Sequence, residues 1–248
     1  MVAPLPSLTA TWHNNTYPTI NPTQPHLSLK GKTVLITGGG RGIGAQTARS
    51  FAAAGASFIS ITGRTSPALE TTKSAIESQY PNTKVLIAVV DVTDEAAMLS
   101  AFAALSQANG GNGIDICVHN AGYLPDVKSI ASSDTSDWWS GFTINILGSF
   151  IVTRAFLKHK NISPSADPVL VDVGTGAVNM TPSPKYSGYV VSKFAQSRFF
   201  EEVAVEESGI RVMQVHPGVI TTEMGQKGID GGREFPADDS KLMAQLIS

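Results

Sequence analysis

The sequence predicts a doubly wound α/β fold, in which helices cover both faces of a parallel β-sheet. Short apolar runs alternate with longer helical patterns from Lys32 onward, and such alternation is typical of parallel strands joined by crossover helices. The apolar runs are continuous, as in strands that are buried on both faces. The first run also leads directly into a glycine-rich turn at residues 37–44 that precedes a helical pattern.

Six strands and five helices are expected to alternate in a three-layer αβα arrangement. The expected strands are Thr33–Thr37, Ser57–Thr62, Lys84–Asp91, Ile114–Asn120, Pro168–Val173 and Ile210–His216. The expected helices are residues 42–54, 67–80, 94–108, 135–159 and 187–208. Because ligands of such folds bind at the carboxyl ends of the strands, the functional site is expected along that edge of the sheet.

The chain is expected to divide into a short arm and one domain. Residues 1–31 contain five prolines among Thr and Asn, a composition that favours neither helix nor strand. This arm is either a loose tail or a segment that packs through Trp12, Tyr17, Ile20 and Leu27. Residues 32–248 are expected to form a single domain, since 42% hydrophobic and 15% charged residues suit a large core.

Composition and charge exclude several classes of function. The net charge of −2 offers no basic surface to nucleic acid. No apolar stretch approaches the ~18 residues that span a bilayer, and the N-terminus lacks the pattern of a secretory signal. The single cysteine, Cys117, can form no internal disulfide and is interpreted as a buried structural thiol. The expected location is the cytoplasm, with no membrane partner and no metal site.

The glycine-rich turn is suited to a pyrophosphate. Gly38, Gly42 and Gly44 permit a tight turn, close approach of the backbone to phosphate, and close contact between helix and strand. The helix that begins near Gly42 directs free N–H groups and its positive dipole end to the same point. The motif therefore predicts a Rossmann-type dinucleotide site, which also includes Thr37 and Ile43.

The end of the second strand distinguishes between the two nicotinamide cofactors. Enzymes that use NAD usually place an acidic residue here for the ribose, whereas this chain has Gly63 and Arg64. Arg64 could bind the 2′-phosphate of NADP as a bidentate partner, and Arg41 could approach the same phosphate. NADP is therefore the expected cofactor and NAD the alternative, while both arginines could instead be ordinary solvated charges.

An ordered set of motifs resembles the short-chain dehydrogenase/reductase family. The set comprises TGxxxGxG at 37–44, Asp91-Val92, the NAG triplet Asn120-Ala121-Gly122, Asn145 within a helix, YxxxK at Tyr189–Lys193, and Pro217-Gly218. The resemblance covers roughly residues 30–225. It implies an oxidoreductase in which these residues bind the cofactor or act on the reacting group.

Tyr189 and Lys193 are the expected acid–base pair. Reduction of a ketone needs a proton for the developing alkoxide, and oxidation of an alcohol needs the reverse. A free tyrosine has a pKa of about 10, which is too high for a base near neutral pH. Because Tyr189 and Lys193 lie four residues apart, they share one face of a helix. The lysine ammonium then lowers the pKa of the phenol. The resemblance implies that Lys193 also contacts the nicotinamide ribose and that Asn145 supports a water-linked proton path.

One position departs from the family pattern. The family usually has a serine after the fifth strand to polarise the substrate carbonyl, and Thr175 stands at the aligned position, fourteen residues before Tyr189. Threonine retains the hydroxyl donor, but its methyl group stiffens χ1 and occupies space beside the substrate. The enzyme is then expected to be slowed or restricted to slim substrates, unless Thr175 is only a turn residue.

The segment after the sixth strand is expected to close over the site. The resemblance implies that Pro217-Gly218 covers the nicotinamide and that Thr222 contacts its carboxamide. Residues 221–236, which contain four glycines, are interpreted as a mobile substrate lid. An ordinary surface loop is the alternative.

The chain ends at Ser248, where family members usually continue through a further helix and a seventh strand. A helical pattern from about Asp238 runs to this end. The usual seventh strand is therefore expected to be missing, as in a shortened fungal-type member, with the sixth strand at an exposed edge. Three explanations for this early end are open. They are a shortened gene product, a mis-assigned reading frame, and a variant whose sheet edge is covered otherwise, for instance by the N-terminal arm.

Two functions of different classes follow. The first is an oxidoreductase that transfers a hydride between NADP(H) and a small ketone/alcohol substrate. The second is a weakly active or non-catalytic nucleotide-binding protein, which Thr175 and the early end favour; sugar-nucleotide epimerases fit less well because they usually show TGxxGxxG spacing. A homo-oligomer is possible through helices 135–159 and 187–208, whose phenylalanines could instead face the sheet: Phe142, Phe156, Phe199 and Phe200.

Overall fold

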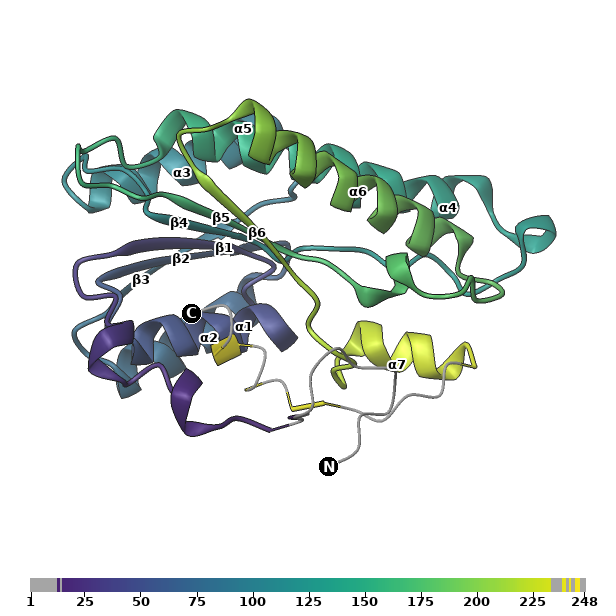
Figure 1. Cartoon of the computed structure of the whole chain (residues 1–248), viewed down its shortest axis with the longest axis horizontal. Helices are drawn as coiled ribbons and strands as arrows, with labels where there is room; N and C mark the ends of the chain where they lie inside the picture. Colours follow the sequence, from purple (N-terminus) through teal and green to yellow (C-terminus); the bar gives the residue numbers. More distant parts are fainter. Residues whose placement is uncertain (1–12, 14, 233–237, 240, 242–243, 246–248) are drawn as a thin grey trace.

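The expected doubly wound arrangement is confirmed by a computed structural model, which describes residues 13, 15–232, 238–239, 241 and 244–245. Six parallel strands form one sheet in the order β3-β2-β1-β4-β5-β6, with helices on both faces (Figure 1). The chain starts in the middle of the sheet, runs outward to β3 and returns at β4. The strand order therefore reverses between β1 and β4, and the carboxyl ends of these strands open the crevice in which such folds bind ligands.

The strands and helices lie close to their expected positions. The strands are β1 (Thr33–Thr37), β2 (Phe58–Gly63), β3 (Lys84–Val89), β4 (Ile116–His119), β5 (Val169–Val173) and β6 (Arg211–Val215). The helices are α1 (Gly42–Ala53), α2 (Ser66–Gln79), α3 (Glu95–Ala108), α4 (Thr135–Phe142), α5 (Gly148–His159), α6 (Ser187–Glu206) and α7 (Glu223–Asp230). Short 3-10 turns are η1 (Pro18–Ile20), η2 (Pro25–Leu27), η3 (Ile130–Ser132) and η5 (Gly176–Asn179).

Two apolar layers join the sheet to its helices. On one face, Phe51 of α1 and Ile76 of α2 pack against the strands. On the other face, Phe102 of α3, Phe156 of α5 and Phe200 of α6 do the same. All five side chains are fully buried. Burial of the central strands β1, β2, β4 and β5 on both faces explains why their sequences are mostly apolar.

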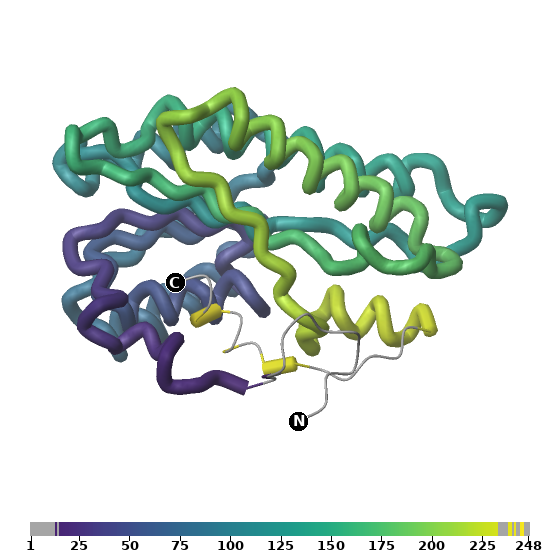
Figure 2. Tube along the Cα trace, in the orientation of Figure 1, coloured from purple at the N-terminus to yellow at the C-terminus, as the bar shows by residue number. Residues whose placement is uncertain are grey.

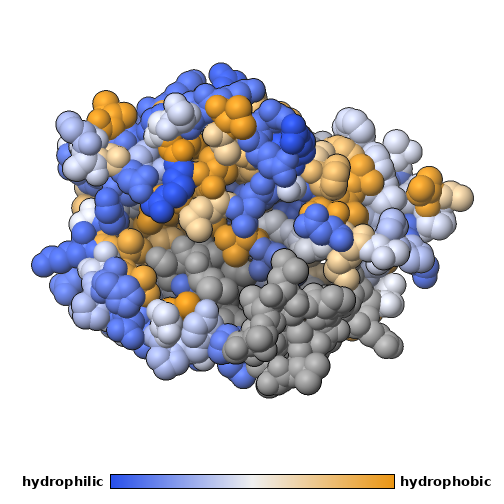
Figure 3. Space-filling model, viewed as in Figure 1, coloured by the Kyte–Doolittle hydropathy of each residue, from blue (hydrophilic) through white to orange (hydrophobic). Residues whose placement is uncertain are grey.

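The strand β6 forms a free edge of the sheet among the described residues. It pairs with β5 alone, and Arg211, Met213 and Gln214 are exposed, whereas β5 is almost entirely buried. Figure 3 shows apolar side chains exposed in the middle of this face, between polar ones. The expectation of a six-stranded sheet with an exposed sixth strand is confirmed for the described part of the chain.

The described part of the N-terminal arm lies beside the layer of α1 and α2 (Figure 2). Leu29 donates its backbone N–H to the carbonyl of Ala54 at 2.8 Å, and its side chain packs against the core on this face. Trp12 lies outside the described residues, and the other predicted anchors are only half-buried: Tyr17, Ile20 and Leu27. Pro22 is buried, and the end of the arm is joined to the domain by Leu29, by a β-bridge between Lys30 and Ala56, and by a hydrogen bond from Gly31 N–H to Ser57 Oγ. None of these described contacts involves β6.

The expected helix at 135–159 is continuous but not uniform. Between α4 and α5 lies a π-helical turn, η4 (Thr143–Leu147), which contains the buried Asn145. Such turns inside α-helices are frequent at functional sites. By length and mean hydropathy (1.3) this helix could cross a membrane, but half of its most apolar window is buried within the protein. It packs against α3 and α6, as the core helix of a globular fold does.

Other apolar side chains of the continuous helix 135–159 and of α6 point away from the sheet. The exposed ones are Trp139, Leu147, Phe150, Val191, Phe194 and Val205. Phe156 and Phe200 face the sheet instead, so they are not available to an oligomer. A homo-oligomer that covers this outer face stays a prediction.

The segment interpreted as a mobile substrate lid, with an ordinary surface loop as the alternative, contains the helix α7. Thr222 caps it by accepting a hydrogen bond from the N–H of Gly225 at 3.0 Å, and Glu223 in the first turn complements the helix dipole. These capping signals outweigh the glycines, so the loop interpretation is wrong for residues 223–230. Residues 233–237 lie outside the described part of the chain, and movement of this segment stays a prediction.

Candidate active site

The turn between β1 and α1 depends on glycine at two positions. Gly42 has a φ of +52°, which a side chain would disfavour. A Cβ atom at Gly44 would meet the carbonyl of Gly38 and lie 2.5 Å from Asn120 Nδ2. Asn120 in turn donates its backbone N–H to Thr37 Oγ1 at 3.0 Å and its side-chain amide to the Thr37 carbonyl at 2.9 Å. These bonds join the turn to the end of β4.

A groove of about 630 Å³, lined by both polar and apolar groups, follows the carboxyl ends of the strands. Gly42 and Ile43, which begin α1, line it. The N-cap residue Arg41 makes no side-chain hydrogen bond to the helix, so this residue leaves the first N–H groups of α1 for a ligand. The volume lies in the range of small-molecule sites, and an uncapped helix start beside a glycine turn fits a pyrophosphate.

Both arginines of the cofactor prediction line the groove, and each faces a carboxylate. Arg41 Nη1 lies 2.9 Å from both carboxylate oxygens of Glu223, and Arg64 Nη1 lies 3.8 Å from Asp91 Oδ2. The arginine side chains are 55% and 69% exposed. Ion pairs at this exposure stabilise a fold by about 0–1 kcal/mol, so an anionic ligand could replace either carboxylate.

Tyr189 and Lys193 lie one turn apart on α6, where the groove meets a second cavity. Tyr189 lines both cavities, and Lys193 lines the groove. The Lys193 side chain is buried, and its Nζ donates hydrogen bonds to the Val173 carbonyl at 3.1 Å and to Gln196 Oε1 at 2.9 Å. Burial lowers the pKa of this ammonium group, and the charge of Asp172 opposes that effect.

The side chain of Asn145, in the π turn, uses all of its polar atoms in hydrogen bonds to neighbouring segments. Its Nδ2 donates to the Tyr123 carbonyl at 3.0 Å and to Ser192 Oγ at 2.9 Å, and its Oδ1 accepts from the Tyr123 N–H at 2.8 Å. Ser192 Oγ donates to the Tyr189 carbonyl at 2.9 Å. The π turn thereby holds Asn145 against the helix that carries Tyr189 and Lys193.

The second cavity, of about 160 Å³, is mainly apolar. Its apolar side chains include Leu124, Ala177, Met180, Ile220 and Met224. Thr175 lines it together with Tyr189. Thr175 Oγ1 accepts a hydrogen bond from the Ala177 N–H at 3.3 Å, and a hydroxyl in that arrangement still has its own hydrogen to donate.

One wall of this second cavity is α7. Ile229 lines it, and the helix is held in place at Gly228, whose carbonyl accepts a hydrogen bond from Tyr186 Oη at 2.6 Å. Lys227 Nζ also donates to the carbonyl of Leu124 at 3.0 Å. A few side-chain contacts therefore hold this wall over the end of the sheet.

The structure brings most of the predicted site residues together. Those that line the groove are Gly38, Arg41, Gly42, Ile43, Arg64, Asp91, Val92, Asn120, Ala121, Gly122, Tyr189, Lys193, Pro217 and Thr222. Thr175 and Gly218 line the apolar cavity instead. Thr37, Gly44 and Asn145 are buried below these surfaces, where they support the turn and α6.

Sequence reasoning missed two features of the site. Glu223, the partner of Arg41, lies 182 residues away from it in the chain, so no local pattern links the two. His119, Asp172 and Gln196 surround Lys193 in the interior. An acidic residue inside the apolar run Val169–Val173 was the signal that could have found this second group.

Fold and site together define a class of protein. A doubly wound α/β fold, with a dinucleotide groove that meets an apolar cavity at a tyrosine and a lysine one turn apart, is that of an NAD(P)-dependent oxidoreductase. Residues 32–231 match the family model described as short chain dehydrogenase. The chain belongs to the short-chain dehydrogenase family.

Curated relatives and solved structures agree with this assignment. Short chain dehydrogenase mpl6 of Monascus purpureus is 32% identical over 98% of this chain and 84% of its own length. Short chain dehydrogenase tazN of Aspergillus terreus is 36% identical over 86% of this chain and 46% of its own length. Both are fungal proteins, as the sequence resemblance implied.

Two solved structures share the fold. A short chain dehydrogenase from Burkholderia cenocepacia, in complex with NADP, superimposes with a TM-score of 0.76 at 26% identity, over 88% of this chain and 89% of that one. Levodione reductase superimposes with a TM-score of 0.73 at 28% identity, over 82% of this chain and 77% of its own.

Proposed function

We propose that the protein transfers a hydride between NADP(H) and a ketone/alcohol pair, with Tyr189 as the general acid or base. The observation that carries this proposal is the position of Tyr189, which lines both the groove and the apolar cavity. A phenol at this junction can exchange a proton with a substrate in the cavity while the groove holds the cofactor.

The groove supports the cofactor part of the proposal. The uncapped start of α1 and the glycine turn would hold the pyrophosphate. Arg41 and Arg64 would bind the 2′-phosphate of NADP in exchange for their exposed carboxylate partners, Glu223 and Asp91. Bound here, the cofactor supplies or accepts the hydride. The NADP complex of a structural relative supports this choice, with NAD as the alternative.

Lys193 and Asn145 would assist Tyr189 in different ways. The charged ammonium of Lys193, one turn away, favours the phenolate and so lowers the pKa of Tyr189 toward neutrality. The same lysine, which lines the groove, would contact the nicotinamide ribose. The Asn145 side chain already uses its polar atoms within the protein, so we propose that it positions α6; a water-linked proton path at this residue stays a prediction.

The apolar cavity indicates the substrate class. A dry apolar cavity of about 150 Å³ holds a benzene molecule, and the cavity beside Tyr189 measures about 160 Å³. The reacting end of the substrate is therefore an uncharged, apolar ketone or alcohol about the width of one ring. Thr175 Oγ1 would donate its hydrogen to the carbonyl oxygen.

Replacement of Tyr189 tests the proposal. Tyr189→Phe removes the phenol oxygen that is proposed to carry the proton but keeps the ring, so we expect kcat to fall at least about 100-fold. NADPH affinity, measured by fluorescence titration, should stay within about twofold of wild type. Activity is measured with a panel of apolar ketones, and Tyr80→Phe, at the end of α2 and outside both cavities, is the matched control.

Two results would contradict the acid–base role. One is wild-type protein that binds NADPH but reduces no ketone of the panel. The other is a Tyr189→Phe variant with unchanged turnover. The first result would favour the second candidate, a nucleotide-binding protein with little or no catalysis, whose supporting observation is that Thr175 already binds Ala177 in a turn. The second result would show that a group other than Tyr189 transfers the proton.

A further inference from the structure

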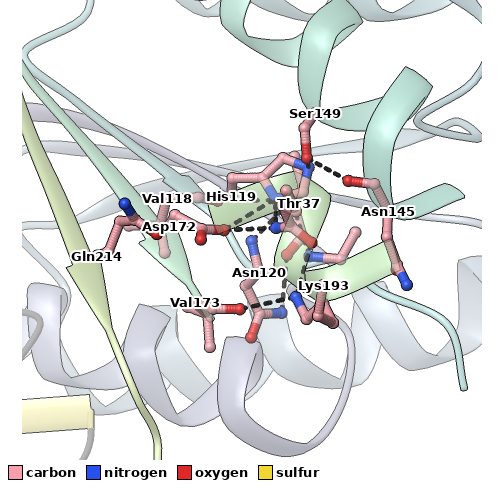
Figure 4. A network of polar contacts seen from close by, with 12 residues as sticks. Thr37, Val118, His119, Asn120, Asn145, Ser149, Asp172, Val173, Lys193 and Gln214 are labelled. Carbon is pink, nitrogen blue, oxygen red and sulfur yellow. Dashed lines mark hydrogen bonds and ion pairs between the residues drawn. The ribbon is translucent and has the colours of Figure 1, made fainter. Parts of the chain in front are cut away.

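Behind Lys193 lies a group of buried polar side chains that the mechanism above does not use. His119 of β4, Asp172 of β5 and Gln196 of α6 are each at most 1% exposed. Figure 4 shows His119 and Asp172 directed into the space between the sheet and Lys193. Polar groups in such surroundings destabilise a fold unless they are hydrogen-bonded. Their partners therefore indicate what the group does.

Gln196 joins these groups to the ammonium. Its Oε1 accepts a hydrogen bond from Lys193 Nζ at 2.9 Å. Its Nε2 donates to Asp172 Oδ1 at 2.5 Å and lies 3.3 Å from His119 Nδ1. The amide thus uses its acceptor and both of its N–H groups. Only one orientation of the amide satisfies all three partners.

The network continues from His119 to the π turn. When Nδ1 accepts from Gln196, the imidazole hydrogen lies on Nε2, which is 3.3 Å from Ser149 Oγ. Ser149 in turn donates to the backbone carbonyl of Asn145 at 2.6 Å. A continuous chain of buried hydrogen bonds therefore connects Lys193 to Asn145.

Asp172 contributes a negative charge to this interior. One oxygen accepts from Gln196, whereas the other, Oδ2, has no hydrogen-bond partner among the described residues. A carboxylate buried in this way destabilises the fold unless a cation compensates it. Gln196 bridges Asp172 Oδ1 to the Lys193 ammonium, and the charge of Asp172 raises the pKa of this lysine against the effect of burial. The His119 imidazole, with Nδ1 3.7 Å from Asp172 Oδ1, faces the same carboxylate.

We infer that Gln196 and Asp172 are positioning residues for Lys193, in which Gln196 fixes the ammonium in place and Asp172 keeps it charged. The inference rests on the proposed function, in which the charged lysine assists Tyr189. Neither Gln196 nor Asp172 is among the residues that line the two cavities. Both therefore act on the reaction through Lys193.

Removal of the Asp172 charge should change the pH dependence in one direction. The other ionisable groups around the ammonium are His119 on β4, Tyr189 on α6, and those across the groove: Arg41, Arg64, Asp91 and Glu223. Loss of a negative charge favours neutral lysine and the phenolate, so the pKa of both groups falls. Ketone reduction needs both groups protonated, so its rate falls above the pH at which either group loses its proton. This alkaline limit of activity therefore moves to lower pH in the variant.

The experiment compares pH profiles of NADPH-dependent ketone reduction in three variants. Asp172→Asn keeps the shape and an acceptor oxygen but removes the charge, so we expect the alkaline limit to move down by about one pH unit. Gln196→Met keeps the charge but cannot accept from Lys193, so we expect kcat to fall about tenfold with an unchanged KM. Thr153→Val, at a buried hydroxyl with no hydrogen-bond partner in the described chain, is the control and should change neither.

A second readout needs no turnover. Nitrogen NMR of the lysine ammonium groups in the cofactor-free protein, with the Lys193 signal assigned through Lys193→Met, should give a lower Lys193 pKa in Asp172→Asn than in wild type. If Asp172→Asn does not fold, the inference is tested by Gln196→Met alone, which should show the lower kcat with an unchanged KM. The inference is overturned if Asp172→Asn has the wild-type alkaline limit and Lys193 pKa, and Gln196→Met has the wild-type kcat, while Tyr189→Phe is inactive. An active Tyr189→Phe variant would instead remove the proposed function, and the lysine titration would still report on the charge pair.

Discussion

The two cavities that meet at Tyr189 are built from different kinds of structure. The groove lies over the strand ends in the middle of the sheet, where Thr37 and Asn120 bind each other through both backbone and side-chain atoms. The apolar cavity lies between segments that follow the last two strands and α7, which is held by single contacts such as that of Tyr186 with Gly228. Backbone geometry shapes the first, whereas side chains shape the second.

This difference predicts how substitutions in the two cavities will behave. A change in the groove should affect the cofactor and the fold together, because the same backbone atoms serve both. A change in the apolar cavity should alter the turnover of the substrate but leave the stability of the sheet and the affinity for the cofactor unchanged. Single substitutions in each cavity test this difference.

The largest effect is expected for Gly44→Ala in the turn beneath the groove. The new methyl group would meet the Gly38 carbonyl and lie 2.5 Å from Asn120 Nδ2, so the turn must shift. Overpacking of this kind costs about 1–3 kcal/mol, and we expect affinity for both NADPH and NADH to fall up to about 100-fold, together with a lower Tm. Calorimetric titration and thermal unfolding measure the two effects.

The matched control for that variant is Gly209→Ala, far from the groove. Its methyl group would meet only the flexible end of Lys160, at 3.4 Å. Cofactor affinity and Tm should therefore be unchanged. A Gly44→Ala protein with wild-type affinity would show that the turn adapts easily and would break the distinction between the two cavities.

A smaller and selective effect is expected for Arg64→Ala. A charge-assisted hydrogen bond to phosphate contributes about 1.5–3 kcal/mol, and the competing contact with Asp91 reduces the net gain. NADPH affinity should fall about tenfold, while NADH affinity stays the same. Arg154→Ala, which removes an arginine from an exposed ion pair with Glu95, is the control. Equal losses for the two cofactors would exclude a phosphate role for Arg64.

The fold and the groove could largely be predicted from the sequence because they depend on local patterns. The run Thr33–Thr37 is a strand with the predicted bounds, and the glycine turn that follows lies where β1 meets α1. The order of motifs along the chain also placed Tyr189 and Lys193 one turn apart on a helix. Each of these inferences needs only neighbouring residues and the periodicity of a helix or strand.

The substrate side could not be predicted in the same way. The glycine-rich segment 221–236 was interpreted as a lid or, alternatively, as a surface loop, whereas the capping contact of Thr222 and the tertiary contact of Tyr186 favour a helix. The bond from Gln196 to Asp172 joins residues 24 positions apart, on α6 and β5. Such contacts arise only when the sheet and its helices pack together, and no local pattern encodes them.

The smallest effect is expected for Thr175→Ser in the wall of the apolar cavity. Serine keeps the hydroxyl donor and removes the methyl group beside Tyr189. Because one methyl group in an apolar pocket contributes about 1–3 kcal/mol to discrimination, kcat/KM should rise several-fold for wider ketones and change little for slim ones. NADPH affinity should stay the same, since Thr175 does not line the groove.

Thr175→Val completes this test because it keeps the shape of the side chain and removes the hydroxyl. Loss of activity toward all ketones would show that the hydroxyl acts on the carbonyl, and the serine variant would then report the role of the methyl group alone. If both variants matched wild type, Thr175 would be only the residue that caps η5 through Ala177. The wall of the substrate cavity would then be defined by α7 and its neighbours, and the catalytic contribution of this side of the site would come from Tyr189 alone.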